Sequence, residues 1–211
     1  MLTTTIRDGP LTPPTGRKAR QTYQRLIDAV VACIAANGSF SGEEVAERAK
    51  VATATFYAYF SSRDEALAAA FDQVLRDLND RSRPFLKVER LLEDGLVSTI
   101  HGLARSVIDQ FRNQHLIYRL AISRMSAEPQ IREVYRHREQ EAYGDMQQFV
   151  RLGMLAGQIR EGDVDTLATT VLITLQGYNN PILVRDGLPE AVLDELAGML
   201  VRLLQPASGP D

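Results

Sequence analysis

Apolar residues recur with the period of an α-helix along nearly the whole chain, and glycine, proline or capping residues separate one apolar stripe from the next. In the first stripe Tyr23, Ile27, Val30 and Ile34 share one face, and a glycine after Asn37 ends it. No segment alternates with the strand period or carries a hairpin turn. The pattern predicts an all-α protein of about nine helices, which cover approximately residues 18–37, 42–49, 53–59, 62–80, 86–113, 115–125, 129–157, 164–179 and 189–204.

The start of the second helix carries two signals within a few residues. Ser41 and Glu44 form the S-x-x-E pattern of a capping box, in which two unpaired backbone N–H groups are satisfied reciprocally. Phe40 and Val45 stand at the positions of a hydrophobic staple. These signals predict a short helix that begins directly after Ser41.

A turn at residues 50–52 separates that helix from a second short one. On the second helix Phe56 and Phe60, four residues apart, point inward together, and Ser62 with Glu65 repeats the capping signal for a longer helix. Two short helices joined by a tight turn, the second with hydroxyl groups on its outer face, are typical of the helix-turn-helix arrangement that places one helix in the DNA major groove. The segment therefore predicts a DNA-binding head.

Residues 44–67 resemble the DNA-binding head of the TetR family of transcriptional regulators. The family's pattern there is IA-x-x-(A)GVS-x-(G)T-(L/F)Y-x-(H/Y)F-x-x-K-E-x-L, and this chain reads EVAERAKVATATFYAYFSSRDEAL. The aromatic ladder and the acidic start of the following helix keep the family's order and spacing. The resemblance covers roughly residues 20–70, and beyond them only length and helical character match.

The chain departs from the family's pattern at three positions of the head. Lys50 replaces a glycine that suits a turn residue at positive φ, so that either the backbone accepts strain of about 1 kcal/mol or the turn differs. Ala52 replaces the usual N-capping serine, so that the helix loses a cap that stabilises it by about 1 kcal/mol, unless Thr53 substitutes. Ala54 replaces a common glycine, which leaves less room for close approach to the DNA backbone.

The resemblance implies which side chains of the head contact DNA. The residues expected to contact phosphates are Thr55, Tyr57, Tyr59 and Arg63. The residues expected to read base edges are Lys50, Thr53 and Ala54, although Lys50 could equally be a solvated surface residue. Just before the head, Arg17 and Lys18 either reach a neighbouring groove or phosphate or simply begin a solvated helix.

The resemblance also implies a helical body with an inducer pocket and a two-fold dimer interface built from the last two helices. Polar or soft residues that interrupt apolar helical faces are candidates for the pocket, with plain core packing as the alternative: Phe111, Tyr118, Met125, Tyr143, Met146, Gln147 and Tyr178. The last two helices carry wide apolar faces that a symmetric dimer would bury. The dimer candidates are Val171, Leu175, Val192, Leu196 and Leu200.

The charge distribution agrees with a DNA-binding head at the N-terminal end. The net charge is −3, yet residues 1–60 hold seven Lys/Arg against five Asp/Glu, whereas the remainder is acidic. A local basic patch is what binds phosphate. The patch is modest, which favours two heads acting together in a dimer.

Other features exclude several classes of protein. A single cysteine, Cys33, allows no intramolecular disulfide and fits a reducing cytoplasm. No signal peptide or membrane-spanning run is present. The three histidines, His101, His115 and His137, lie on different predicted helices without metal-ligand spacing, and no catalytic motif appears. We expect no enzymatic activity, metal or cofactor.

The sequence predicts four parts: a disordered arm at 1–16, a helix-turn-helix domain at 17–61, a regulatory, ligand-binding and dimerisation domain at 62–205, and a tail at 206–211. The expected function is a homodimeric repressor that a small, mainly apolar ligand releases from its operator. An activator or ligand-independent regulator with the same head is an alternative. An all-α small-molecule-binding protein or enzyme without DNA binding is another, and the salt dependence of DNA binding would distinguish it.

Overall fold

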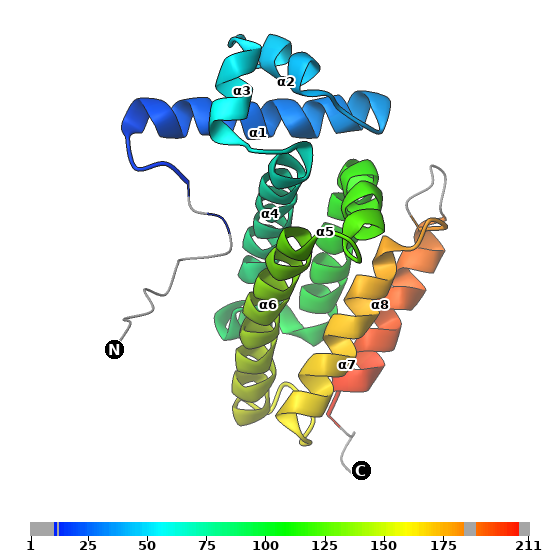
Figure 1. Cartoon of the computed structure of the whole chain (residues 1–211). Coiled ribbons are helices and arrows are strands. Elements are labelled where there is room, and N and C mark those ends of the chain that lie inside the picture. The colour runs from blue at the N-terminus through cyan, green and yellow to red at the C-terminus, as the bar shows by residue number, and fades with distance from the viewer. Residues whose placement is uncertain (1–10, 12, 184–188, 207–211) are drawn as a thin grey trace, which may run out of the picture. The chain divides into compact units, whose positions relative to one another are not determined.

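The computed structural model describes residues 11, 13–183 and 189–206. Within these residues the chain forms eight α-helices, two short 3₁₀ helices and no strand, which confirms the all-α prediction (Figure 1). The elements in chain order are α1 (Arg17–Asn37), α2 (Gly42–Arg48), α3 (Thr53–Tyr59), α4 (Arg63–Ser82), η1 (Arg83–Leu86), α5 (Val88–Arg124), α6 (Pro129–Leu155), α7 (Val164–Gln176), η2 (Gly177–Asn179) and α8 (Glu190–Leu204).

The helix count is eight rather than nine because the two helices expected at 86–113 and 115–125 form one element, α5. Its backbone leaves helical geometry at Gln114 (φ −121°, ψ 16°), where the break was expected, and resumes at once. A second irregularity lies at Gly95 (φ 77°, ψ 165°), in a region that glycine adopts without a Cβ clash. Helical geometry is thus interrupted twice within α5, and the interruption at Gln114 coincides with the boundary that the sequence predicted between two helices.

The ends of the helices follow local chemistry. Gly38 takes the left-handed conformation after α1, and its N–H donates to the Ile34 carbonyl at 2.8 Å. The helix expected to reach residue 179 ends at Gln176, because the next three residues wind more tightly as η2. Pro181 lies beyond both elements, so it follows a helix end rather than kinking a helix.

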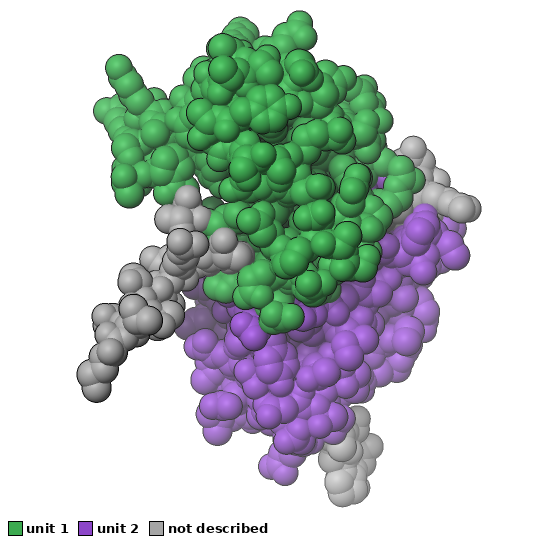
Figure 2. All heavy atoms as spheres, in the orientation of Figure 1, with its two compact units in different colours: residues 1–76, 116–138 green, residues 77–115, 139–211 purple. Residues whose placement is uncertain are grey.

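The chain divides into two compact units (Figure 2). Unit 1 comprises residues 1–76 and 116–138, and unit 2 comprises residues 77–115 and 139–211. Helices α4, α5 and α6 each continue from one unit into the other. Residues 63–76 of α4 belong to unit 1, so this unit extends past residue 61, where the sequence had placed the end of the head. The functional boundary at 61 stays a prediction.

Aromatic rings fill the core of unit 1. In Figure 1 α2 and α3 lie over α1, and the ring of the buried Phe56 on α3 lies 5.5 Å from that of Phe60. Tyr23 of α1 places its ring 5.4 Å from Phe60. Further along, Phe71 of α4 meets Tyr118 of α5 edge to face at 5.6 Å, a favoured geometry for aromatic pairs. The last contact joins α4 to residues 116–138 within unit 1.

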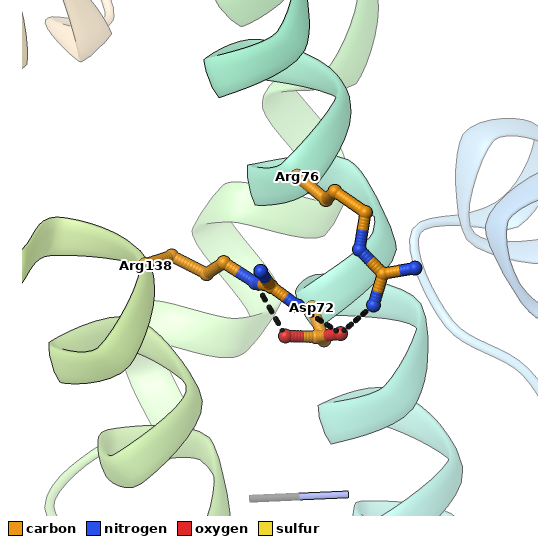
Figure 3. A network of polar contacts seen from close by, with 3 residues as sticks. All are labelled: Asp72, Arg76 and Arg138. Carbon is orange, nitrogen blue, oxygen red and sulfur yellow. Dashed lines mark hydrogen bonds and ion pairs between the residues drawn. The ribbon is translucent and has the colours of Figure 1, made fainter. Parts of the chain in front are cut away.

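A buried ion-pair network joins α4 to α6 within unit 1 (Figure 3). Arg138 donates from Nε to one Asp72 carboxylate oxygen at 2.8 Å and from Nη2 to the other at 3.0 Å, and both side chains are only 9% exposed. Arg76, one helical turn from Asp72, adds a third bond at 2.7 Å. The paired hydrogen bonds fix the geometry of α6 against α4 as a single contact could not.

In unit 2, α7 and α8 pack side by side (Figure 1). Both helices bury apolar side chains: Leu167, Val171, Leu175, Leu193, Ala197, Leu200 and Leu204. The hydroxyl of Tyr178 donates to the Leu196 carbonyl at 3.1 Å. Arg160 completes the end of α8, because its backbone N–H and its Nε donate to the carbonyls of Leu204 and Leu203. No helix in the described ranges is long and apolar enough to cross a membrane.

Candidate functional site

Both capping signals of the head are present in the structure. The Ser41 N–H donates to the Glu44 carboxylate at 2.7 Å, and the Glu44 N–H donates to the Ser41 hydroxyl at 3.2 Å, which confirms the predicted capping box. At α4 the Glu65 N–H donates to the Ser62 hydroxyl at 3.0 Å, while its carboxylate accepts from the Ser61 N–H instead of from Ser62. These caps fix where α2 and α4 begin, and therefore where α3 lies between them.

The turn between α2 and α3 accepts the lysine in a left-handed conformation. Lys50 has φ 55°, and among the described residues it is the one non-glycine residue with positive φ. The Val51 N–H donates to the Ala46 carbonyl at 2.9 Å across the turn. Of the two alternatives, the backbone therefore carries the strain, and the exposed Lys50 side chain stands beside the start of α3.

The start of α3 lacks a side-chain cap. Ala52 occupies the N-cap position with extended backbone, and no side chain accepts a hydrogen bond there, so Thr53 does not substitute for the missing serine. The first backbone bond of the helix runs from the Thr55 N–H to the Ala52 carbonyl at 2.8 Å. Free N–H groups at the start of this helix are therefore available to solvent or to an external acceptor.

The outer face of α3 carries several of the residues that are predicted to contact DNA. Ala54 and Ala58 are exposed, Thr53, Thr55 and Tyr59 are partly exposed, and Tyr57 is 50% exposed. The inner face carries the two buried phenylalanines. Helical periodicity therefore separates a core face from a hydroxyl-bearing face, as predicted, although contact with DNA itself stays a prediction.

Tyr57 is held in place by its neighbours although half of it is exposed. Its ring meets the Phe56 ring edge to face at 5.1 Å. It also crosses the start of α2 so closely that a Cβ added to Gly42 would lie 2.9 Å from the Tyr57 hydroxyl. Gly42 therefore makes room for the ring, a relation between residues 15 apart that the sequence pattern did not reveal.

Three cations at the edges of the head have no ion-pair partner among the described residues. Arg63 is exposed at the start of α4 and stacks over the Phe40 ring at 5.6 Å, which orients it without neutralising it. Arg17 and Lys18 are exposed at the start of α1. Most of the predicted arm, residues 1–10 and 12, lies outside the described residues, as does most of the predicted tail at 207–211.

The pKa of one tyrosine on α1 is strongly raised. Burial raises the pKa of Tyr23 to about 12, and the Asp72 and Glu65 carboxylates add to the rise. Tyr23 also lines a polar cavity of about 210 Å³ with Asp72 and Arg76, against which Leu11 and Pro13 lie. Sequence reasoning placed Tyr23 only on the apolar stripe of its helix and missed the network around Asp72.

Unit 2 contains an apolar cavity with a volume of about 70 Å³. Its walls come from α4, η1, α5, α6 and α7: Leu78, Asn79, Ser82, Leu86, Leu103, Val107, Phe111, Ala142, Asp145, Met146, Leu172, Leu175 and Gln176. Two of the seven predicted pocket residues, Phe111 and Met146, are among them. The cavity is small beside typical ligand pockets of about 300–1,000 Å³.

The other five predicted pocket residues do not line this cavity. Tyr118 packs on Phe71 in unit 1, and Met125 also belongs to unit 1. Gln147 donates to Asp165 at 2.7 Å, and Tyr178 bonds to α8 as described above. Tyr143 is half-buried outside the cavity wall. Helical period identifies the apolar face of a helix but not the surface against which it packs.

Some of the predicted dimer residues are buried inside the protomer and others are exposed on its surface. Val171, Leu175 and Leu200 are buried within the protomer itself, so their side chains pack inside the chain rather than on its surface. Val192 is 37% exposed, and Leu196 is partly exposed. The sequence did not single out Ile173 on α7 and Met199 on α8, which are 61% and 52% exposed.

Residues 26–70 match the family model described as bacterial regulatory proteins, tetR family. A putative TetR-family regulator from Mesorhizobium loti is 17% identical, with a TM-score of 0.73 over 90% of this chain and 100% of that chain. A TetR regulator from Haloarcula marismortui is 13% identical, with a TM-score of 0.71 over 87% and 96%. The fatty acid degradation regulator FadR from Bacillus halodurans is 19% identical, with a TM-score of 0.64 over 94% and 100%. No curated protein matches the sequence.

Proposed function

Because the chain is a TetR-family DNA-binding transcriptional regulator, we propose that it acts as a homodimeric repressor that a small, mainly apolar ligand releases from its operator. The observation that carries the proposal is the outer face of α3, with its hydroxyl groups and small side chains. The unpaired cations Lys50 and Arg63 flank that face. Hydroxyl groups and cations contact phosphates, and small side chains permit close approach to bases.

A dimer is supported by the apolar side chains that α7 and α8 leave exposed. Ile173, Val192 and Met199 lie on the two helices whose other faces are already buried, and a two-fold interface would remove them from water. Two heads would then contact half-sites about 34–36 Å apart, or a multiple of that spacing. Two modest basic patches together can supply an affinity that one patch alone does not.

Release by a ligand is supported by the apolar cavity in unit 2. A ligand that binds more tightly to a conformation with the wrong spacing of heads would shift the population away from the DNA-bound state. Coupling free energies of about 1–3 kcal/mol are typical of such systems. Because α4 continues from unit 1 into unit 2, it is the element through which we expect the two sites to communicate.

The small volume of the cavity supports a second candidate, a regulator that needs no diffusible ligand. About 70 Å³ is little space for an effector unless side chains move. The head and its DNA chemistry would be the same in both cases. We propose the cytoplasm as its location in both, because the chain carries a single, buried cysteine and needs access to DNA.

Fluorescence anisotropy on DNA fragments that the protein selects from its source genome tests the proposal. We expect the logarithm of the affinity to fall linearly with the logarithm of salt concentration, by about 0.9 per phosphate contacted. The double variant Tyr57→Phe, Tyr59→Phe removes two hydroxyl groups and should weaken binding roughly tenfold or more. Tyr143→Phe, on a half-buried tyrosine of unit 2, is the matched control and should bind normally. Selection of no fragment above random DNA would refute the proposal.

A further inference from the structure

Gly42 lies where the ring of Tyr57 crosses the start of α2. The glycine is buried, and a Cβ added to it would lie 2.9 Å from the Tyr57 hydroxyl oxygen and 3.1 Å from Cζ of the same ring. It would also lie 3.1 Å from Cδ1 of Phe56. Carbon atoms in ordinary contact are about 3.5–4.0 Å apart. Any side chain at position 42 therefore has to displace one of these two rings.

Of the two rings, that of Tyr57 is the one with room to move. Phe56 is fully buried, and its ring lies 5.5 Å from that of Phe60 in the close-packed core of unit 1. Tyr57 is half-exposed, and its hydroxyl is the far end of a flexible side chain. A methyl group at position 42 therefore moves the Tyr57 hydroxyl outward and leaves the core nearly unchanged.

The backbone at the start of α2 is held on both sides, so it does not retreat from the ring. The two hydrogen bonds of the capping box between Ser41 and Glu44 fix the first turn. Val45 and Ala46 anchor the next turn, because both are buried. Alanine is a better helix former than glycine, so the glycine at position 42 serves the ring rather than the helix.

We propose that Gly42 is a positioning residue for DNA binding: its lack of a side chain sets the place at which the Tyr57 hydroxyl meets a phosphate. This inference rests on the proposed function, because it takes Tyr57 to contact DNA. A hydrogen bond between a hydroxyl and a phosphate oxygen spans about 2.5–3.0 Å. A displacement of roughly half an ångström takes the hydroxyl out of that range or into a clash. Residue 42 therefore controls affinity without touching the nucleic acid.

A double-mutant cycle, measured by anisotropy on the DNA that the wild-type protein selects, tests the proposal. Gly42→Ala should weaken binding about three- to tenfold when Tyr57 is present. In a Tyr57→Ala background no ring remains to be displaced, so the same substitution should change the affinity by less than about twofold. Low salt keeps the weaker complexes measurable. Gly144→Ala is the matched control and should bind normally, because a Cβ added at this exposed position on α6 meets nothing within 4 Å.

Two further measurements distinguish a displaced hydroxyl from a damaged head. The urea midpoint of Gly42→Ala should stay within about 0.5 M of the wild-type value, because the group that moves is the exposed end of a side chain. The slope of the logarithm of affinity against the logarithm of salt concentration should also stay the same, because the substitution removes no charge.

An equal loss of affinity in both backgrounds would show that Gly42→Ala acts through α2 or Phe56 instead of Tyr57, and it would overturn the proposal. No loss when Tyr57 is present would overturn it too, as would a changed salt slope or a urea midpoint lowered by more than about 0.5 M. In each of these cases a wild-type protein that binds its selected DNA remains a regulator. Absence of specific binding by the wild-type protein refutes the proposed function and this inference with it.

Discussion

Lys50 holds a backbone conformation that most side chains avoid. Its φ of 55° places the Cβ close to the following carbonyl, which costs roughly 1–2 kcal/mol for a residue other than glycine. The same residue is an exposed cation next to the outer face of α3. Backbone strain at a functional turn can be retained when the side chain contributes to function, and two substitutions separate these contributions.

Lys50→Gly should raise the free energy of unfolding by about 0.5–1 kcal/mol, because the strain is relieved while the unfolded chain gains some freedom. Lys50→Gln keeps the strain and removes the charge, so its free energy of unfolding should change by less than about 0.5 kcal/mol. If the charge contacts DNA, both variants should lose the same affinity. Urea unfolding and DNA anisotropy measure the two effects. A glycine variant less stable than the glutamine variant would contradict the strain argument.

Tyr23 links the stability of unit 1 to alkaline pH. Its pKa is raised to about 12 in the folded chain from an ordinary 10, so folding favours the protonated phenol. The stabilisation that the protonated phenol provides is fully present below pH 10 and is lost as pH rises from 10 to about 12. Because the side chain is partly exposed, we discount the shift to roughly 1–2 kcal/mol.

Urea unfolding between pH 9 and pH 11.5 measures that loss. Tyr23→Phe should abolish the part due to this residue, whereas Tyr143→Phe should not. Tyr178, whose pKa burial also raises to about 12, contributes with the same sign and accounts for part of the remaining slope. An unchanged pH dependence in Tyr23→Phe would show that the phenol titrates normally.

At the scale of elements, the contact between α4 and α6 depends on a residue pair that no local pattern predicts. Asp72 and Arg138 are 66 positions apart, and their pairing offsets the cost of burying the two charges. Arg136, two residues away on α6, instead pairs with Glu133 at 2.8 Å on the surface. The two arginines therefore provide a matched comparison on one helix.

Arg138→Met should lower the free energy of unfolding by about 3 kcal/mol, because it leaves the buried Asp72 carboxylate with only Arg76 of the network in Figure 3. Arg136→Met should cost less than about 0.5 kcal/mol, since exposed pairs contribute little. Chemical denaturation of the two variants measures the difference. Equal stabilities would mean that the Asp72–Arg138 pair contributes no more than a surface contact.

The same contrast explains what the sequence could predict. Caps, helix periods and the aromatic ladder are encoded within a few residues, so the head's elements and both capping signals were predicted from residues such as Ser41 and Glu44. The Asp72–Arg138 pair and the close approach of Tyr57 to Gly42 depend on tertiary packing. Burial of Val171 inside the protomer was missed for the same reason, because a wide apolar face does not reveal which neighbour covers it.

For the molecule as a whole, the proposed dimer makes DNA affinity depend on residues far along the chain from the head. Ile173→Glu with Met199→Glu places charges on the exposed apolar positions of α7 and α8, where an interface would bury them unpaired. We expect a monomer at micromolar concentration by light scattering and a loss of operator affinity of about a hundredfold or more.

Leu155→Glu provides the control for this prediction. Leu155 is 80% exposed at the end of α6, so the same kind of charge enters an exposed apolar position outside the last two helices. This variant should remain dimeric and bind DNA normally. A dimer that survives the double substitution would place the interface elsewhere on the surface.

The composition of unit 1 from two stretches of chain determines how the head can be transplanted. A fragment that stops after the first half of α4 would leave Phe71 without the Tyr118 ring and Asp72 without Arg138, since both partners return from residues 116–138. A chimaera that exchanges operator specificity between two regulators must therefore carry both stretches or leave these contacts unchanged. Replacement of the surface of α3 alone satisfies the second condition, which makes α3 the smallest part that can be exchanged.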